Sequence, residues 1–224
     1  MSWWAEAGVD ALVDEAPRDW LKPASPAPAT TAAETEPAPA LPDTLDAFRA
    51  WLTDPAALPL GALLAPRLGP SGDPASGLMV MIDMPGQADF AAGALLSGAP
   101  GDLFDKMMAA IGRSRETHYL ASLSPLRTPT GALDPADAAK LADIARHHIG
   151  LVRPRALLLF GDACAKALLG GAVTAVRGRW HDLDTPAGPV RALTTIRPEK
   201  LALVPGLKKL AWEDLQMLKE GLTE

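Results

Sequence analysis

Four short apolar runs, each separated from the next by a helical pattern, constrain the fold of this chain more than any other feature. The runs are LMVMI at 78–82, YLASL at 119–123, ALLLF at 156–160 and VRALTTI at 190–196. Short apolar runs bounded by turn signals are typical of strands that are covered on both faces. The sequence therefore predicts an α/β fold, a three-layer αβα sandwich around a central four-stranded, mostly parallel sheet.

The segments between the runs carry helix start and stop signals. Asp102 and Asp134 are expected N-caps, and Pro135 fits the first helical position. The expected helices cover 45–52, 102–112, 134–152, a segment that begins at 161–162, and 206–220. His147 and His148 are neighbours within the third of these helices, so their rings diverge. We expect an exposed or half-buried pair there, not metal ligands.

Composition narrows the class of protein. The single cysteine, Cys164, excludes a disulfide framework and any metal site built on four cysteines. No apolar stretch is long enough to span a membrane, and the N-terminus does not read as a secretory signal, so we expect a cytoplasmic protein. Residues 1–99 carry four Lys or Arg against thirteen Asp or Glu, whereas residues 100–224 carry seventeen against fourteen. The net positive charge of the second half suits it to bind phosphate groups, although an ordinary solvated surface has the same balance of charges.

A Pro/Ala-rich segment divides the chain. Residues 22–43 contain six Pro and seven Ala, a composition typical of an extended, semi-rigid linker. It separates an N-terminal peptide, 1–21, from a domain at 44–224. The peptide carries Trp3, Trp4 and Trp20, half of the six tryptophans in the chain. Either the peptide folds back on its own domain or it binds a protein partner.

The carboxyl ends of the predicted strands are the expected place for a ligand in such a fold. These ends fall at 83–86, 122–127, 161–163 and 197–200. The tight turn at Pro85-Gly86 would leave backbone N–H groups to face a ligand. The cations near these ends that could hold phosphate groups are Arg127, Arg177, Arg179, Arg197 and Lys200.

From about 78 to 218 the sequence resembles the iron–sulfur branch of the uracil-DNA glycosylase superfamily. The segments that carry the resemblance are LFDKMMAAIG (103–112), IGLVRPRALLLFGDACAKALLG (149–170), VTAVRGRWHDL (173–183) and AWEDLQMLKEGL (211–222). The opening WWAEAGVDALVDEAP is similar to the N-termini of bacterial members. The resemblance implies an association with DNA repair, and DNA as a partner.

The first motif of that family departs from its usual form here. The family has a Gly-Glu-x-Pro-Gly loop that shapes the pocket and holds the attacking water. The corresponding residues 82–86 keep Pro85 and Gly86, but Asp83 replaces the glutamate and is one methylene shorter. If the chain is active, the resemblance implies that Asp83 is its catalytic carboxylate.

The other pocket positions also differ from the family pattern. Leu96 aligns with the phenylalanine on which the base stacks, and Ser122 aligns with the asparagine that reads the base edge. The last motif begins Arg197-Pro198 in place of His-Pro, so the residue that stabilises charge on the uracil oxygen is an arginine. Base excision needs stacking, edge hydrogen bonds and charge stabilisation together.

The cluster cysteines are missing as well. Two of them align with Leu126 and Leu141, and the other two fall before the first strand, where no cysteine exists. We therefore expect no iron–sulfur cluster, no other cofactor, and apolar side chains in the space that the cluster would fill.

Three hypotheses follow for the function. The first is a degenerate member of the superfamily, without catalysis or with weak activity, that still binds DNA. The second is a non-catalytic interaction subunit, similar in layout to the psi subunit of the bacterial clamp loader, which has a glycosylase-like fold and binds its partner through an N-terminal peptide. The third is an active glycosylase with rearranged chemistry, which removes uracil or a related base.

Deletion of residues 1–21 separates the two interpretations of the N-terminal peptide. Burying one large aromatic side chain is worth about 2–3 kcal/mol, which favours docking on the peptide's own domain. We expect deletion to lower the melting temperature measured by circular dichroism. An unchanged melting temperature, with loss of a partner in a pull-down, would instead support the protein-partner interpretation.

Overall fold

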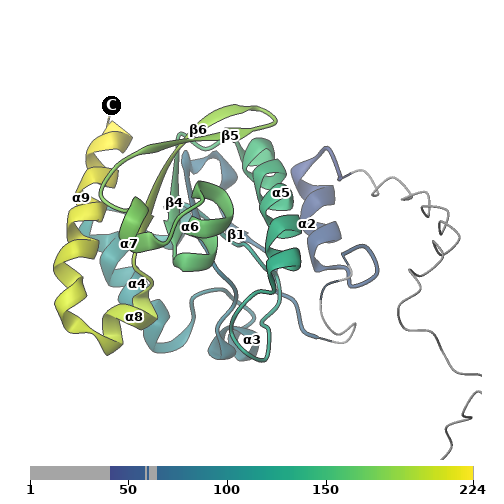
Figure 1. Ribbon diagram of the computed structural model, residues 1–224, viewed down its shortest axis with the longest axis horizontal. Coiled ribbons are helices and arrows are strands. Elements are labelled where there is room, and N and C mark those ends of the chain that lie inside the picture. The colour runs from purple at the N-terminus through teal and green to yellow at the C-terminus, as the bar shows by residue number, and fades with distance from the viewer. Residues whose placement is uncertain (1–40, 59, 61–64, 224) are drawn as a thin grey trace, which may run out of the picture. The chain divides into compact units, whose positions relative to one another are not determined.

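A six-stranded sheet lies at the centre of the described part of the protein (Figure 1). The computed structural model describes residues 41–58, 60 and 65–223, so the predicted peptide at 1–21 and residues 22–40 of the predicted linker lie outside the described residues. The strand order is β1-β3-β2-β4-β6-β5. The strands are β1 (Ser71–Gly72), β2 (Leu78–Ile82), β3 (Tyr119–Ser122), β4 (Ala156–Phe160), β5 (His181–Thr185) and β6 (Gly188–Thr195).

The sheet confirms the predicted α/β class but corrects the strand count from four to six. The four predicted strands are the central ones, β3, β2, β4 and β6, and neighbours among them pair in parallel. The two additional strands, β1 and β5, are antiparallel edge strands. Strand β5 was missed because its sequence HDLDT is mostly polar and only Leu183 is buried. Strand β1 was missed because two residues give no pattern.

The buried strands send alternate side chains to the two faces of the sheet. Leu78, Val80 and Ile82 of β2 pack into one apolar cluster, with helices α4 (Gly98–Ala110) and α9 (Lys208–Thr223). Met79 and Met81 pack into the other, with helices α2 (Leu45–Thr53), α5 (Pro135–Val152) and α6 (Asp162–Leu169). This alternation is the period-two geometry of a strand that is covered on both faces. It produces the three layers that the sequence predicted.

Five of the helices in the described residues were predicted, with shifted ends, and three short ones of four to six residues were not. The helices are α2 (Leu45–Thr53), α3 (Gln87–Ala92), α4 (Gly98–Ala110), α5 (Pro135–Val152), α6 (Asp162–Leu169), α7 (Val173–Val176), α8 (Pro198–Leu203) and α9 (Lys208–Thr223), with 3-10 turns at Pro74–Ser76, Arg115–Thr117 and Pro205–Leu207. Asp134 caps α5 as expected, because its side chain accepts from the Ala136 N–H. Asp102 is not an N-cap, since α4 begins at Gly98 after Ser97. Among the described residues, no helix is long and apolar enough to cross a membrane.

Two neighbouring histidines join helix α5 to other parts of the fold. The His147 ring bonds to the Pro42 carbonyl at 2.8 Å, and the His148 Nε2 lies 2.9 Å from the Tyr119 hydroxyl. The same hydroxyl accepts from Nε of Arg49 in α2. The expectation of an exposed or half-buried pair is wrong for His148, which is buried against Phe48. The Tyr119 hydroxyl can donate to Nε2 of a neutral His148 ring that carries its proton on Nδ1.

Protonation of His148 should destabilise the fold on acidification. Burial lowers the pKa of His148 from 6.5 to about 3, so between these values the unfolded chain binds a proton that the folded one does not. The free energy of unfolding should have its full value above pH 6.5. It should fall by about 1.4 kcal/mol per pH unit as the pH decreases below 6.5. We expect urea unfolding of the native protein to show a steeper decline between pH 6.5 and 5 than unfolding of His148→Gln. Parallel profiles for the two proteins would contradict this assignment.

Candidate functional site

Two cavities open at the carboxyl edge of the sheet, where the sequence placed the ligand site. The larger has a volume of about 1060 Å³ and the smaller about 420 Å³. Charged residues of the larger cavity are Asp83, Asp162, Lys166, Arg177, Arg197 and Lys200, and its apolar walls include Leu133, Val173, Ile196, Leu207 and Leu210. The smaller lies beside the Pro85-Gly86 turn and includes Met84, Asp89, Leu96, Arg127, Arg197 and Glu199. Arg197 lines both cavities, so one guanidinium stands between the two spaces.

The Asp83 carboxylate is buried and its oxygens are engaged. Its Oδ1 accepts the Cys164 backbone N–H at 2.7 Å, and its Oδ2 lies 3.5 Å from Nη1 of Arg197. The Cys164 N–H belongs to the first turn of α6 and has no partner within that helix. Burial raises the pKa of Asp83, and the backbone N–H of Cys164 and the Arg197 charge partly oppose this rise. Asp83 therefore caps a neighbouring helix and pairs with a cation.

Gly161 leaves room for the Asp83 carboxylate and the Arg197 side chain to come close to each other. It has φ of 107°, and a Cβ placed on it would lie 2.3 Å from Asp83 Oδ2 and 2.7 Å from Arg197 Cδ. A residue with a side chain would collide with both partners and would also resist this backbone conformation. The turn from β4 into α6 thus depends on glycine at this position.

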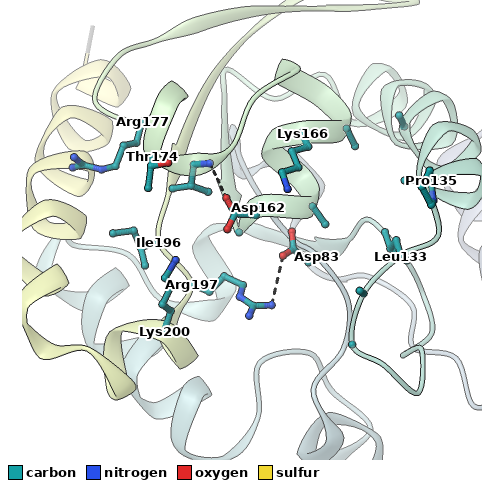
Figure 2. Close-up of a pocket in the computed structure, with 18 of the residues that line it drawn as sticks. Asp83, Leu133, Pro135, Asp162, Lys166, Thr174, Arg177, Ile196, Arg197 and Lys200 are labelled. Atoms are coloured by element: carbon teal, nitrogen blue, oxygen red, sulfur yellow. Dashed lines mark hydrogen bonds and ion pairs between the residues drawn. The ribbon is translucent and has the colours of Figure 1, made fainter.

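Three cations line the larger cavity together with Asp83. Figure 2 shows Lys166 of α6 on one side of Asp83, and Arg197 with Lys200, at the start of α8, on the other. Lys166 and Lys200 are exposed, and the Arg197 side chain is 43% exposed. Pro198 is buried as the first residue of α8, which fixes the position of this pair. The predicted Arg197 and Lys200 therefore lie together, and Lys166 joins them.

The Pro85-Gly86 turn is held by a residue that the sequence reasoning missed. The buried Asp89 accepts the Gly86 N–H at 2.8 Å, the Leu96 N–H at 3.0 Å and the Ser97 N–H at 2.7 Å. The Gly86 N–H is thus not free to face a ligand, contrary to expectation. The three-residue spacing from Gly86 to Asp89, typical of a helix N-terminus, is the signal that could have revealed this contact.

Leu96 adopts a left-handed backbone conformation that is unusual for leucine. Its φ is 53°, and its carbonyl accepts from Nη2 of Arg115 at 2.6 Å. Gly101 approaches the same carbonyl so closely that a Cβ there would lie 1.9 Å from it. The Leu96 side chain packs into the α4 and α9 cluster and is only 2% exposed. The position that aligns with a base-stacking ring therefore contributes core packing.

The remaining predicted residues do not all meet at one place. Ser122 is buried at the end of β3 and is not among the described residues that line either cavity. Arg127 is exposed, lines the smaller cavity and donates to the Pro85 carbonyl at 3.3 Å. Arg179 is exposed but lines neither cavity.

Arg177 is engaged within the fold. Its guanidinium donates to both carboxylate oxygens of Asp214, at 2.9 and 3.1 Å, and to the Leu210 carbonyl. Asp214 is fully buried and also accepts from the Thr195 hydroxyl. Figure 2 shows Arg177 pointing toward α9 and away from Asp83. The Arg177–Asp214 pair therefore joins the end of α7 to α9, and the Thr195 hydroxyl joins Asp214 to β6.

The fold and the site define a class of protein. It is an α/β protein whose sheet has two cavities lined by cations at its carboxyl edge. Residues 70–216 match the family described as the uracil DNA glycosylase superfamily, and the chain belongs to this superfamily. A curated relative is the type-4 uracil-DNA glycosylase of Archaeoglobus fulgidus. It is 21% identical over 145 residues, which cover 62% of this chain and 73% of the relative.

The residues present do not fit the iron–sulfur cluster that the resemblance implies. Cys164, the one cysteine of the chain, is fully buried, and burial raises the pKa of its thiol far above its ordinary value. Leu126 and Leu141 are both buried and belong to one apolar cluster, together with Leu58 and Leu60. A cluster of four thiolate ligands has no donor set here.

Leu141 should therefore behave as a core residue. It is 0% exposed, and shrinking a buried leucine costs about 1–3 kcal/mol when part of its volume is kept. We expect Leu141→Cys to lower the melting temperature, whereas the exposed Ala139→Cys, which also adds a thiol, should change it little. We also expect purified protein to contain no iron by elemental analysis. Stoichiometric iron, or a Leu141→Cys protein as stable as the original, would contradict this account.

Proposed function

We propose that this protein is a DNA-binding member of the uracil-DNA glycosylase superfamily that removes uracil very slowly or not at all. The observation that carries the proposal is the engagement of Asp83, the carboxylate of the first motif. Its Oδ1 is occupied by the Cys164 N–H and its Oδ2 is paired with Arg197. A carboxylate committed to these partners is poorly placed to hold and activate a water molecule.

The cavity linings support the same conclusion. None of the described residues that line either cavity is aromatic. Stacking on an aromatic ring is worth about 1–3 kcal/mol per base, and losing one charge-stabilising donor typically costs about 100- to 1,000-fold in rate. Both losses together leave little to hold a flipped base or to stabilise its departure.

Exposed cations and an exposed apolar side chain support DNA binding at this edge. Lys166 and Lys200 line the larger cavity and are open to solvent. Leu203, one turn after Lys200 at the end of α8, is 82% exposed, and the adjacent Val204 is 47% exposed. Apolar wedges flanked by phosphate-binding cations are a common means of entering between base steps.

We also propose that the protein carries no iron–sulfur cluster.

A second candidate function, slow base excision by Asp83, rests on the position and the pKa of that carboxyl group. Asp83 lines the larger cavity, and burial raises its pKa, as is common for catalytic carboxylates. The interaction-subunit hypothesis depends on residues 1–21, which lie outside the described residues. DNA-binding and excision assays together distinguish the three functions.

DNA binding should depend on salt and on the cations at this edge. We expect fluorescence anisotropy with a 30-base-pair duplex containing one uracil to show binding that weakens between 50 and 200 mM NaCl. The Lys166→Gln/Lys200→Gln variant should bind more weakly, by roughly tenfold per phosphate contact near 0.1 M salt. The matched control is Arg153→Gln/Lys219→Gln, which removes two exposed cations that line neither cavity. Equal effects of the two double variants, or no binding, would contradict the proposal.

Excision is tested on the same duplex. We expect no strand cleavage after alkaline treatment within the time in which an active uracil-DNA glycosylase completes the reaction. Cleavage at a comparable rate would reject the proposal, and its loss in Asp83→Asn would then establish the second candidate.

A further inference from the structure

The large apolar side chains that the described residues expose gather in one stretch of the chain. They are Leu203, Val204 and Trp212, which are 82%, 47% and 43% exposed. The first two lie at the end of α8, which leads into the lower end of α9, where Trp212 lies (Figure 1). Exposed apolar groups that gather beside polar ones mark a place where something binds.

Trp212 differs from the other tryptophans of the described chain. Trp51 packs against Phe48 with the ring centroids 5.7 Å apart, and the Arg191 guanidinium lies 4.5 Å from the centre of the Trp180 ring. Within the same described ranges, Trp212 has no such aromatic or cation partner. The exposed part of its indole is therefore open to a flat ligand.

Trp212 shares one side of α9 with groups that suit a phosphate chain. Residues three, four and seven positions from it in a helix lie on the same side. At these positions stand three lysines and a glutamine: Lys208, Lys209, Gln216 and Lys219. We call these four residues and Trp212 the α9 platform. All three lysines are exposed, and no described carboxylate forms an ion pair with them.

The carboxylates of α9 leave the platform positive. Asp214 is buried and bonded to Arg177, and Glu213 lies 3.8 Å from the same guanidinium. Glu220 is the remaining carboxylate between the two ends of the helix, against the three lysines. The platform also adjoins the larger cavity, because Leu207, the residue directly before α9, lines that cavity.

An aromatic ring beside lysines is an arrangement with which proteins bind unpaired strands, because the ring stacks on a base while the cations follow the phosphates. Inside a duplex both faces of a base are already covered by its neighbours, so an exposed indole favours an unpaired base. At about 1.5 Å per residue, the platform from Lys208 to Lys219 is about 16 Å long, the length of about five stacked nucleotides.

We propose that the α9 platform binds an unpaired segment of DNA, with Trp212 stacked on one of its bases. The inference rests on the proposed DNA-binding function and names the DNA structure that the protein selects. A duplex held at the carboxyl edge of the sheet would continue along α9 as a single strand. The preferred ligand is then a junction between paired and unpaired DNA.

Competition against a labelled blunt duplex, measured by fluorescence anisotropy, tests the inference. The unlabelled competitors are the blunt duplex, the same duplex with a six-nucleotide overhang at its 3′ or its 5′ end, and matched duplexes whose overhang is six propanediol phosphate units. These units keep the phosphates and remove the bases. We expect a base-bearing overhang at one of the two ends to bind about tenfold more tightly than its propanediol counterpart.

Variants of Trp212 connect this preference to the platform. Trp212→Leu, which keeps an apolar side chain without a ring, should reduce the ratio to about one, whereas Trp212→Phe should keep most of it. Lys208→Gln/Lys209→Gln should weaken binding of every overhang duplex. The matched control Lys106→Gln/Lys140→Gln removes two exposed lysines of α4 and α5 and should leave it unchanged. Melting temperatures of all variants verify folding.

The outcomes separate this inference from the proposed function. Equal binding of base-bearing and propanediol overhangs, or a ratio unchanged in Trp212→Leu, would overturn the inference while salt-dependent duplex binding still supported the proposed function. Binding of a polyglutamate peptide that is lost in Trp212→Leu, without a preference for overhangs, would assign the platform to an acidic protein and also overturn it. Absence of binding to every DNA would reject both.

Discussion

The carboxylate of Asp83 is the interaction on which the functional edge of this protein depends. It lies at the end of the central strand β2, caps the first turn of α6 through the Cys164 N–H, and pairs with Arg197 before α8. Three separate segments therefore meet at one buried group, and Gly161 supplies the space for them. Burying a carboxylate is unfavourable unless its oxygens are satisfied, so these contacts must persist for the edge to keep its shape.

This arrangement is the basis of the proposed function, DNA binding with little or no base excision. The carboxylate at the first motif acts as a helix cap, and the arginine at the last motif is its counter-ion at 3.5 Å. Catalysis by electrostatic preorganisation requires groups that await the reaction with unfilled hydrogen-bonding capacity. What remains open at the edge is positive charge, on Lys166, Lys200 and Arg127, and an exposed leucine at 203. Under the proposed function, these groups contact the DNA backbone.

The sequence predicted the parts of the fold that local patterns determine. Strands β2 and β4 were predictable because all five residues of each are apolar and buried, whereas the polar edge strand β5 was not. The candidate site was predictable as positions at strand ends, and resemblance to a family singled out Asp83 and Arg197. Their partners were not predictable, because Cys164 is 81 residues from Asp83 and Asp214 is 37 residues from Arg177. Contacts of this range depend on how the elements pack, which no local pattern encodes.

Amide hydrogen exchange at Cys164 tests the central claim most directly, since that N–H is the donor to Asp83. In the native protein this N–H and the amides of the buried strand β4 should all exchange slowly. In Asp83→Ala the account predicts that protection is lost selectively in the first turn of α6, at Ala163 and Cys164, while β4 stays protected. Unchanged protection of Cys164 in the variant would contradict the role of Asp83 as the anchor of this site.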